Sequence, residues 1–89
     1  MLLTLHIKKD APGVYTAWVL NGDAEVAEFQ VGNIASAIRE AAQSQPSGVS
    51  GWHIWYEHVS IGTTAIVAMK HDAETLAQRL MVMHGQFFS

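Results

Sequence analysis

Cysteine is absent from the 89 residues of this chain, and cationic residues are few. Without cysteine there is no disulfide framework, no thiolate zinc site, no cysteine nucleophile and no CxxC redox pair. Five Lys and Arg stand against eight Asp and Glu, which gives a formal net charge of −3 at pH 7. Binding to nucleic acid needs several cations that converge on phosphates. Five dispersed cations therefore do not predict a nucleic-acid-binding protein.

Long apolar runs are also absent from the sequence. No run approaches the roughly 18 apolar residues that a membrane span requires. The opening MLLTLHIKKD is too short for the apolar region of a signal peptide and has no basic region before it. We therefore expect a cytoplasmic protein that has no contact with a membrane.

The residues that are present describe one small globular domain. Hydrophobic residues make up 49% of the chain and charged residues 15%. Globular domains usually contain roughly 25% charged residues, so few charges are left to cover the surface. The length fits a single domain over residues 1–89. We expect part of its apolar surface to be buried against a partner.

Alternating apolar and polar residues predict strands in the first third of the chain. Apolar residues at every second position indicate a strand over about residues 2–8. The segment 14–20 is rich in β-branched and aromatic residues, and 25–31 continues as the second strand of a hairpin. Between them, Asn21 and Gly22 both accept the positive φ of a type I′ turn. One face of the second strand is apolar and consists of Ala27, Phe29 and Val31.

Two helices are predicted, and each begins after an Asx residue. Apolar residues at helical spacing follow Asn33 and predict a helix over about 34–44. Asp72 caps the second helix, and Gly85 is a candidate residue for its end. We expect the Phe87–Phe88 pair beyond it to dock on the domain.

The region between the two helices completes the predicted fold. Residues 44–51 are rich in Ser, Gly and Pro and predict a flexible connector. The segment 52–58 is aromatic and strand-like, and the apolar run 63–69 is typical of a strand covered on both faces. The order β-ββα-ββα predicts an α+β fold, with a single antiparallel sheet of about five strands and two helices on one face. The similar layout of the two ββα halves suggests a distant internal duplication.

Two helices cover only one face of such a sheet, and several strands have apolar residues on both faces. A sheet face in contact with solvent usually carries polar side chains, so this pattern predicts a second buried surface. We expect a homodimer or higher oligomer that forms through sheet faces or edge strands. The alternative is that a strong twist and the chain ends cover the surface. The aromatic residues expected at the interface are Tyr15, Trp18, Trp52, Trp55 and Tyr56.

Chemical motifs are scarce in the polar residues. The five histidines are His6, His53, His58, His71 and His84. They form no HxH or HExxH pattern, so we predict no metal site. No GxSxG elbow or phosphate-binding loop occurs, and we predict no catalytic residue and no cofactor. Because His53 and Glu57 would share one strand face, and His6 could join them from another strand, these three residues form a speculative pocket.

Together these patterns predict a non-enzymatic protein-interaction or regulatory accessory module that acts as a homo-oligomer. The alternative is a small-molecule-binding protein or minor enzyme with a pocket at the subunit interface, lined by Trp55, His53 and Glu57. A further alternative is that the aromatic residues stack the bases of single-stranded nucleic acid. That function also needs a cationic groove, which the predicted sheet does not supply.

Overall fold

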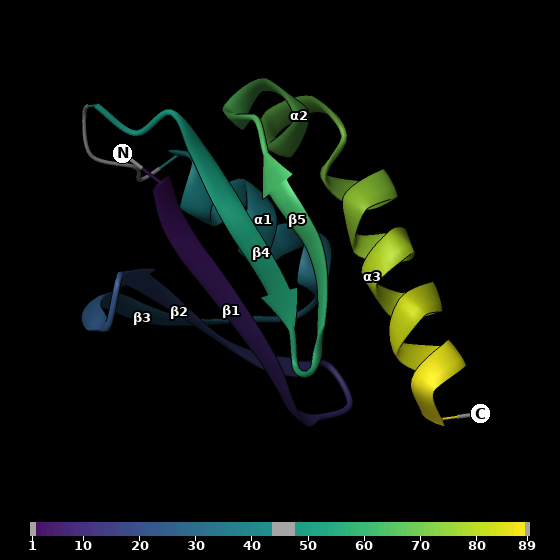
Figure 1. Cartoon of the computed structure of the whole chain (residues 1–89). Helices are drawn as coiled ribbons and strands as arrows, with labels where there is room; N and C mark the ends of the chain where they lie inside the picture. The colour runs from purple at the N-terminus through teal and green to yellow at the C-terminus, as the bar shows by residue number, and fades with distance from the viewer. Residues whose placement is uncertain (1, 44–47, 89) are drawn as a thin grey trace.

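The computed structural model describes residues 2–43 and 48–88, with side chains described as far as residue 85 (Figure 1). The fold is α+β, as predicted, but the described residues form three helices instead of two. The elements are β1 (Leu2–Ala11), β2 (Val14–Asn21), β3 (Ala24–Val31), α1 (Ile34–Gln43), β4 (Gly51–Tyr56), β5 (Val59–Thr64), α2 (Ile66–His71) and α3 (Ala73–Phe88).

The sheet is mixed, so the prediction of an antiparallel sheet is wrong. Its strand order is β3-β2-β1-β4-β5, with β1 at the centre. Strand β1 pairs with β2 in antiparallel orientation and with β4 in parallel orientation. The chain reaches β4 through α1, and a helical crossover of this kind can place a strand parallel to a distant one. Alternation in a sequence assigns residues to faces, but it does not identify the neighbouring strand.

The apolar run at 63–69 is not a strand. Strand β5 ends at Thr64, and α2 begins two residues later. Met69 is fully buried while Val67 is 69% exposed, so one side of this short helix faces the core and the other faces solvent. A short apolar run is compatible with a buried strand or a buried helix, because periodicity alone does not separate the two.

The β2–β3 hairpin is confirmed, although its turn differs from the prediction. Asn21 pairs with Ala24, so the turn consists of Gly22 and Asp23. Gly22 has a φ of 63°, whereas Asp23, the other central residue, is not among the residues with positive φ. The turn is therefore not type I′, which requires positive φ at both central residues.

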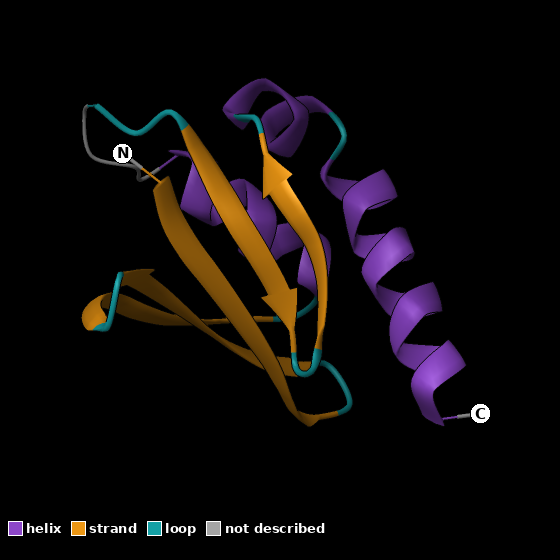
Figure 2. Cartoon of the chain, in the orientation of Figure 1, coloured by secondary structure: helices purple, strands orange, loops and turns teal. Residues whose placement is uncertain are grey.

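In Figure 2, α1 lies behind the sheet, α2 lies beyond the end of β5 and α3 flanks the β5 edge, so none of them lies in front of β1 and β4. In Figure 1, α1 crosses behind β1 and β4, and α3 runs beside β5. The inward face of β1 carries three side chains that are at most 1% exposed. They are Leu3, Leu5 and Ile7. Their partners on β2 and β4 face the same way, and the predicted inward set on β3 agrees with this register.

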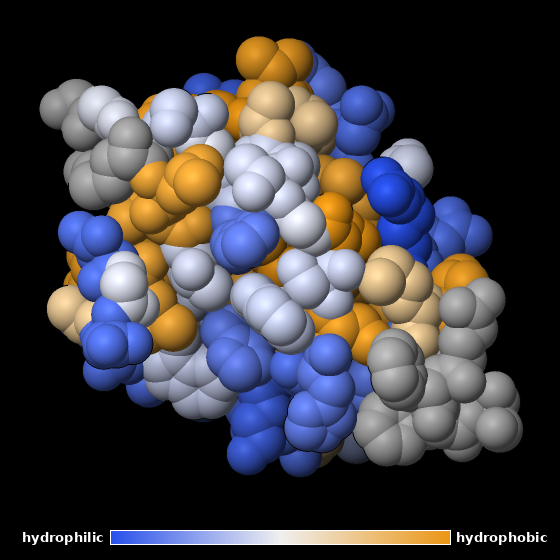
Figure 3. Space-filling view, in the orientation of Figure 1, coloured by the Kyte–Doolittle hydropathy of each residue, from blue (hydrophilic) through white to orange (hydrophobic). Residues whose placement is uncertain are grey.

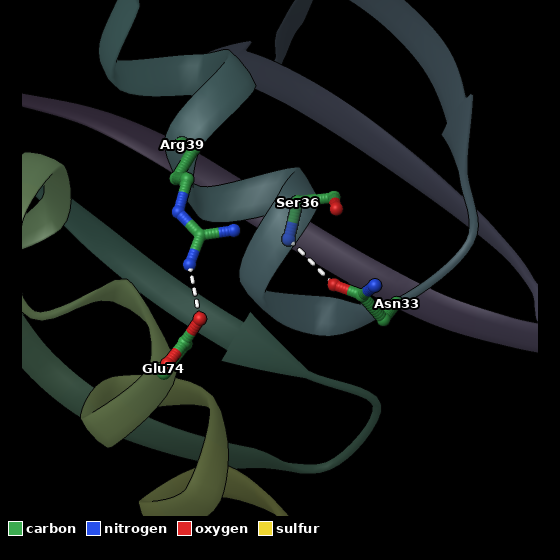
Figure 4. Close-up of polar contacts among 4 residues, drawn as sticks. All are labelled: Asn33, Ser36, Arg39 and Glu74. Atoms are coloured by element: carbon green, nitrogen blue, oxygen red, sulfur yellow. Dashed lines mark hydrogen bonds and ion pairs between the residues drawn. The ribbon is translucent and has the colours of Figure 1, made fainter.

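Helix α1 begins and packs as its sequence predicts. The Asn33 side-chain oxygen accepts a hydrogen bond of 2.8 Å from the Ser36 amide (Figure 4). The buried stripe is rich in alanine, which allows the helix to approach the strands closely. Arg39 also forms an ion pair of 2.7 Å with Glu74 at the start of α3 (Figure 4). The Arg39 and Glu74 side chains are 42% and 81% exposed, so solvent screens the pair and it contributes little to stability.

Four smaller predictions concern the chain after α1. The connector prediction at 44–51 extends too far, because β4 begins at Gly51, and residues 44–47 lie outside the described part. The backbone carbonyl of Asp72 accepts the Leu76 amide at 3.0 Å, as expected at a helix start. Gly85 lies inside α3 and does not end it. The Phe87–Phe88 side chains are outside the described residues.

We predict that the substitution Asn33→Ala lowers the free energy of unfolding by about 1 kcal/mol, because it removes the acceptor of the Ser36 amide. Asn33→Asp keeps an acceptor at that position and should retain most of the stability. Urea denaturation followed by circular dichroism measures both variants. Equal stability of the wild type and Asn33→Ala would show that the cap contributes nothing.

Candidate functional site

One face of the sheet carries none of the described helices, and we call it the outer face. A row of residues in register crosses all five strands on this face. The row consists of Glu28, Trp18, His6, Trp55 and Ser60. The central strand thus places an imidazole between two indoles, one from each neighbouring strand. This juxtaposition depends on the strand order and is not visible in the linear sequence.

The five aromatic residues expected at an interface do not lie together. Trp18 and Trp55 are on the outer face, where Trp55 is 36% exposed. Trp52 and Tyr56 point to the opposite side and are 1% and 5% exposed in the core. Tyr15 also faces the helix side and is half-buried. Two of the five are therefore left on the open surface of the sheet.

The rest of the outer face is mixed in polarity. Its other side chains are Leu2, Thr4, Lys8, Thr16, Leu20, Gln30, His53 and Thr63. In Figure 3 the side above β1, β4 and β5 is mostly pale or blue, and orange occurs in separate patches. The outer face is therefore less apolar than the sequence pattern indicates, because most of the large apolar residues turned toward the helices.

A cleft of about 430 Å³ lies on the outer face, close to the β4–β5 turn. Its lining residues are His6, Lys8, Trp18, Glu57 and His58. Two members of the speculative pocket, His6 and Glu57, therefore meet here. The third, His53, is exposed on the same face opposite Thr4 and does not line the cleft. Lys8 and Trp18 also line the cleft, although the sequence pattern did not place them in this pocket.

Hydrogen bonds fix the two rings of the cleft. Trp18 donates from Nε1 to Glu28 Oε1 at 2.7 Å. The His6 ring lies edge-on to Trp18, with centroids 6.2 Å apart and an interplanar angle of 68°. His6 Nε2 is 3.2 Å from the backbone oxygen of Glu57. A carbonyl oxygen only accepts, so Nε2 carries the proton and Nδ1 is the acceptor of a neutral ring.

Glu57 connects the cleft to the rest of the domain. It lies in the turn after β4, so it does not share a strand face with His53 as predicted. Its amide donates to the Ile7 carbonyl at 2.9 Å, and its carboxylate accepts from His84 Nε2 at 3.0 Å. Its φ of 53° is in the left-handed region, which in the described chain no other non-glycine residue adopts. The surrounding contacts hold this strained backbone in place.

On the helix side of the sheet, Tyr56 is surrounded by other polar rings. Its ring centroid lies 4.9 Å from that of His84 and 6.3 Å from that of Tyr15. Burial raises the pKa of Tyr56 above 10.0, and the negative charges of Tyr15 and Glu57 add to the effect. A second hollow lies next to these rings, and Lys9 is among its lining residues. Lys8 and Lys9, which are adjacent on β1, thus reach opposite sides of the sheet.

Strand β3 forms the open edge of the sheet. At the other edge, α3 packs against β5, whereas no described element continues the sheet beyond β3. Most side chains of β3 are exposed, and Val26 is 54% exposed. A groove of about 290 Å³ separates β3 from α1, and Phe29 and Trp52 are among its lining residues. The buried Nε1 of Trp52 finds no acceptor among the described residues, an arrangement that costs about 1–3 kcal/mol.

Neither a metal site nor a membrane helix is found in the described part of the chain. Within residues 2–43 and 48–88, no group of three or more His, Asp or Glu residues is arranged to hold a metal ion. Within the same ranges, no helix has the length and apolar character to cross a bilayer.

We predict that Tyr56→Phe removes the tyrosine that ionises last when absorbance is followed at alkaline pH. The pKa of Tyr56 is raised in the folded state, so its contribution to stability is present below about pH 10 and is lost as the pH rises through the folded-state pKa. The variant should therefore lose less stability above pH 10 than the wild type does. Tyr15→Phe is the control and should retain the late ionisation. Identical alkaline titrations of the wild type and Tyr56→Phe would contradict the prediction.

Comparison with known proteins assigns no family to this fold: no family model matches the chain, and neither the curated proteins nor the solved structures give a match.

Proposed function

We propose that this chain is a non-enzymatic protein-interaction module that works as a homo-oligomer, in which a second copy pairs along β3. The observation that carries the proposal is the open edge of the sheet at Ala24–Val31. An edge strand presents unpaired backbone N–H and C=O groups, which another strand can pair with. A paired edge would join the two sheets into one continuous sheet, which is the assembly that we propose for an accessory or regulatory module.

The composition of β3 supports pairing at this edge. Natural edge strands often carry lysine, proline or an inward charge that prevents pairing. Strand β3 contains neither lysine nor proline, and its two charges are Glu25 and Glu28. A bulge opposite Val19 and Leu20 interrupts the strand near the turn, so the regular part is Ala27–Val31. This segment is long enough for a short antiparallel ladder.

One antiparallel register satisfies both faces of the extended sheet. With Phe29 opposite Phe29 of the second copy, Ala27 lies opposite Val31 on the helix side. Glu28 then lies opposite Gln30 on the outer face, twice by symmetry. No like charges face each other in this register, and each Glu28 gains an amide partner. The groove between β3 and α1 of each copy would then meet that of the other copy at the junction.

The outer face is a weaker candidate for contact between two copies. An interface there would remove the exposed side chains of Lys8, His53 and Thr63 from water, and buried polar groups without hydrogen bonds are costly. Pairing along β3 instead satisfies the polar backbone of the edge. Of the two modes of assembly that the sequence predicts, we therefore propose contact between edge strands.

We predict opposite effects of two substitutions at Gln30, an exposed residue of β3. Gln30→Glu places like charges opposite each other twice in the interface and should raise the dissociation constant about tenfold. Gln30→Lys places opposite charges there and should lower it. Light scattering over a tenfold dilution series measures the transition to the 9.7 kDa monomer.

The control for net charge is Gln78→Glu on α3, which flanks the other edge of the sheet and should leave the assembly unchanged. A wild-type monomer at every concentration would contradict self-association. An oligomer that responds equally to Gln30→Glu and Gln30→Lys would show that the contact lies elsewhere.

A further inference from the structure

We propose that the cleft on the outer face binds a planar aromatic carboxylate, with its ring against Trp18 and its carboxylate at Lys8. The inference is independent of the assembly along β3, because the cleft opens on the face of the sheet and not at its edge.

The wall of the cleft is an indole that is already oriented. Glu28 holds the Trp18 ring through Nε1, and the His6 ring packs against it edge-on. A side chain fixed in this way loses little conformational freedom when a ligand binds. Flat apolar rings stack on such a surface, and aromatic pairs contribute beyond their buried area. The fixed indole therefore favours a planar aromatic group over a flexible chain.

Among the side chains that line the cleft, the Lys8 ammonium is a group that can pair with an anion. The Lys8 ammonium forms no ion pair or hydrogen bond with any side chain in the described ranges. The two nearby carboxylates are already engaged, since Glu28 accepts from Trp18 and Glu57 accepts from His84 on the other side of the sheet. An added carboxylate would consequently be the natural partner of Lys8, and a charge-assisted hydrogen bond is stronger than a neutral one.

The spacing between indole and ammonium fits one small molecule. Trp18 pairs with His6 and Thr16 pairs with Lys8, so Trp18 and Lys8 are diagonal neighbours on adjacent strands. Such neighbours are separated by about 7–8 Å, and the lysine side chain can shorten the distance to the cleft. A ring stacked on the indole would therefore hold a directly attached carboxylate within reach of Lys8. The volume of about 430 Å³ is within the usual size of ligand pockets.

The test uses 2-naphthoate as the probe and the full chain labelled with nitrogen-15. The indole N–H resonance of Trp18 should shift and saturate at probe concentrations near or below about 1 mM, whereas that of the buried Trp52 should not move. The neutral probe 2-naphthamide should bind about tenfold more weakly, because it lacks the charge that pairs with Lys8.

Two variants form a matched pair, since Lys8 and Lys9 are adjacent but reach opposite sides of the sheet. Lys8→Gln should weaken naphthoate binding about tenfold, and Lys9→Gln should leave it unchanged. Both variants alter the net charge equally and concern flexible side chains. Repeating the titration at protein concentrations above and below the monomer transition separates this site from the proposed assembly, and the affinity should be unchanged.

Four results would overturn the proposal. The first is the absence of a saturable shift at Trp18. The second is equal affinity for naphthoate and naphthamide, which would show that no anion is recognised. The third is equal loss of binding in Lys8→Gln and Lys9→Gln. The fourth is a set of shifts around Tyr15 and Tyr56, which would place the ligand on the helix side.

Discussion

The structure depends on strand β1, which buries one of its faces and pairs with a neighbouring strand on each side. Its odd-numbered side chains Leu3, Leu5 and Ile7 are buried beneath the helices, and its backbone pairs with a neighbour on each side. Burial of three large aliphatic side chains contributes several kcal/mol and fixes the register of the strand, because a shift by one residue would expose all of them. The same constraint places His6 and Lys8 on the opposite face, where they line the cleft.

The two proposed binding surfaces follow from how three helices are distributed over a five-stranded sheet. The helices cover one face and α3 also protects the β5 edge, so the outer face and the β3 edge remain. These two surfaces have different chemistry. The edge offers unpaired backbone groups with few side-chain charges, which suits another strand, whereas the face offers oriented rings and an ammonium, which suits a small ligand.

Glu57, a turn residue, connects strand β1 to helix α3. Its backbone contacts His6 and Ile7, and its side chain contacts His84 on α3. The sequence identified Glu57 and His6 as companions but placed His53 with them, on the assumption that the strand continues to His58. The strand ends at Tyr56, so Glu57 leaves the period-two pattern. A strained φ at a non-glycine residue has no signature in a single sequence.

The sequence by itself determined the local features that neighbouring residues control: the β2–β3 hairpin, the Asn33 cap and the inward faces of β1 and β3. Period-two and helical spacing are properties of short segments, so they can be read without the fold. Only the tertiary structure decided that β4 lies parallel to β1, that Ile66–His71 is a helix and that Trp18 and Trp55 flank His6. These outcomes depend on which distant segments compete for the same core, and that competition is settled by packing across the whole domain.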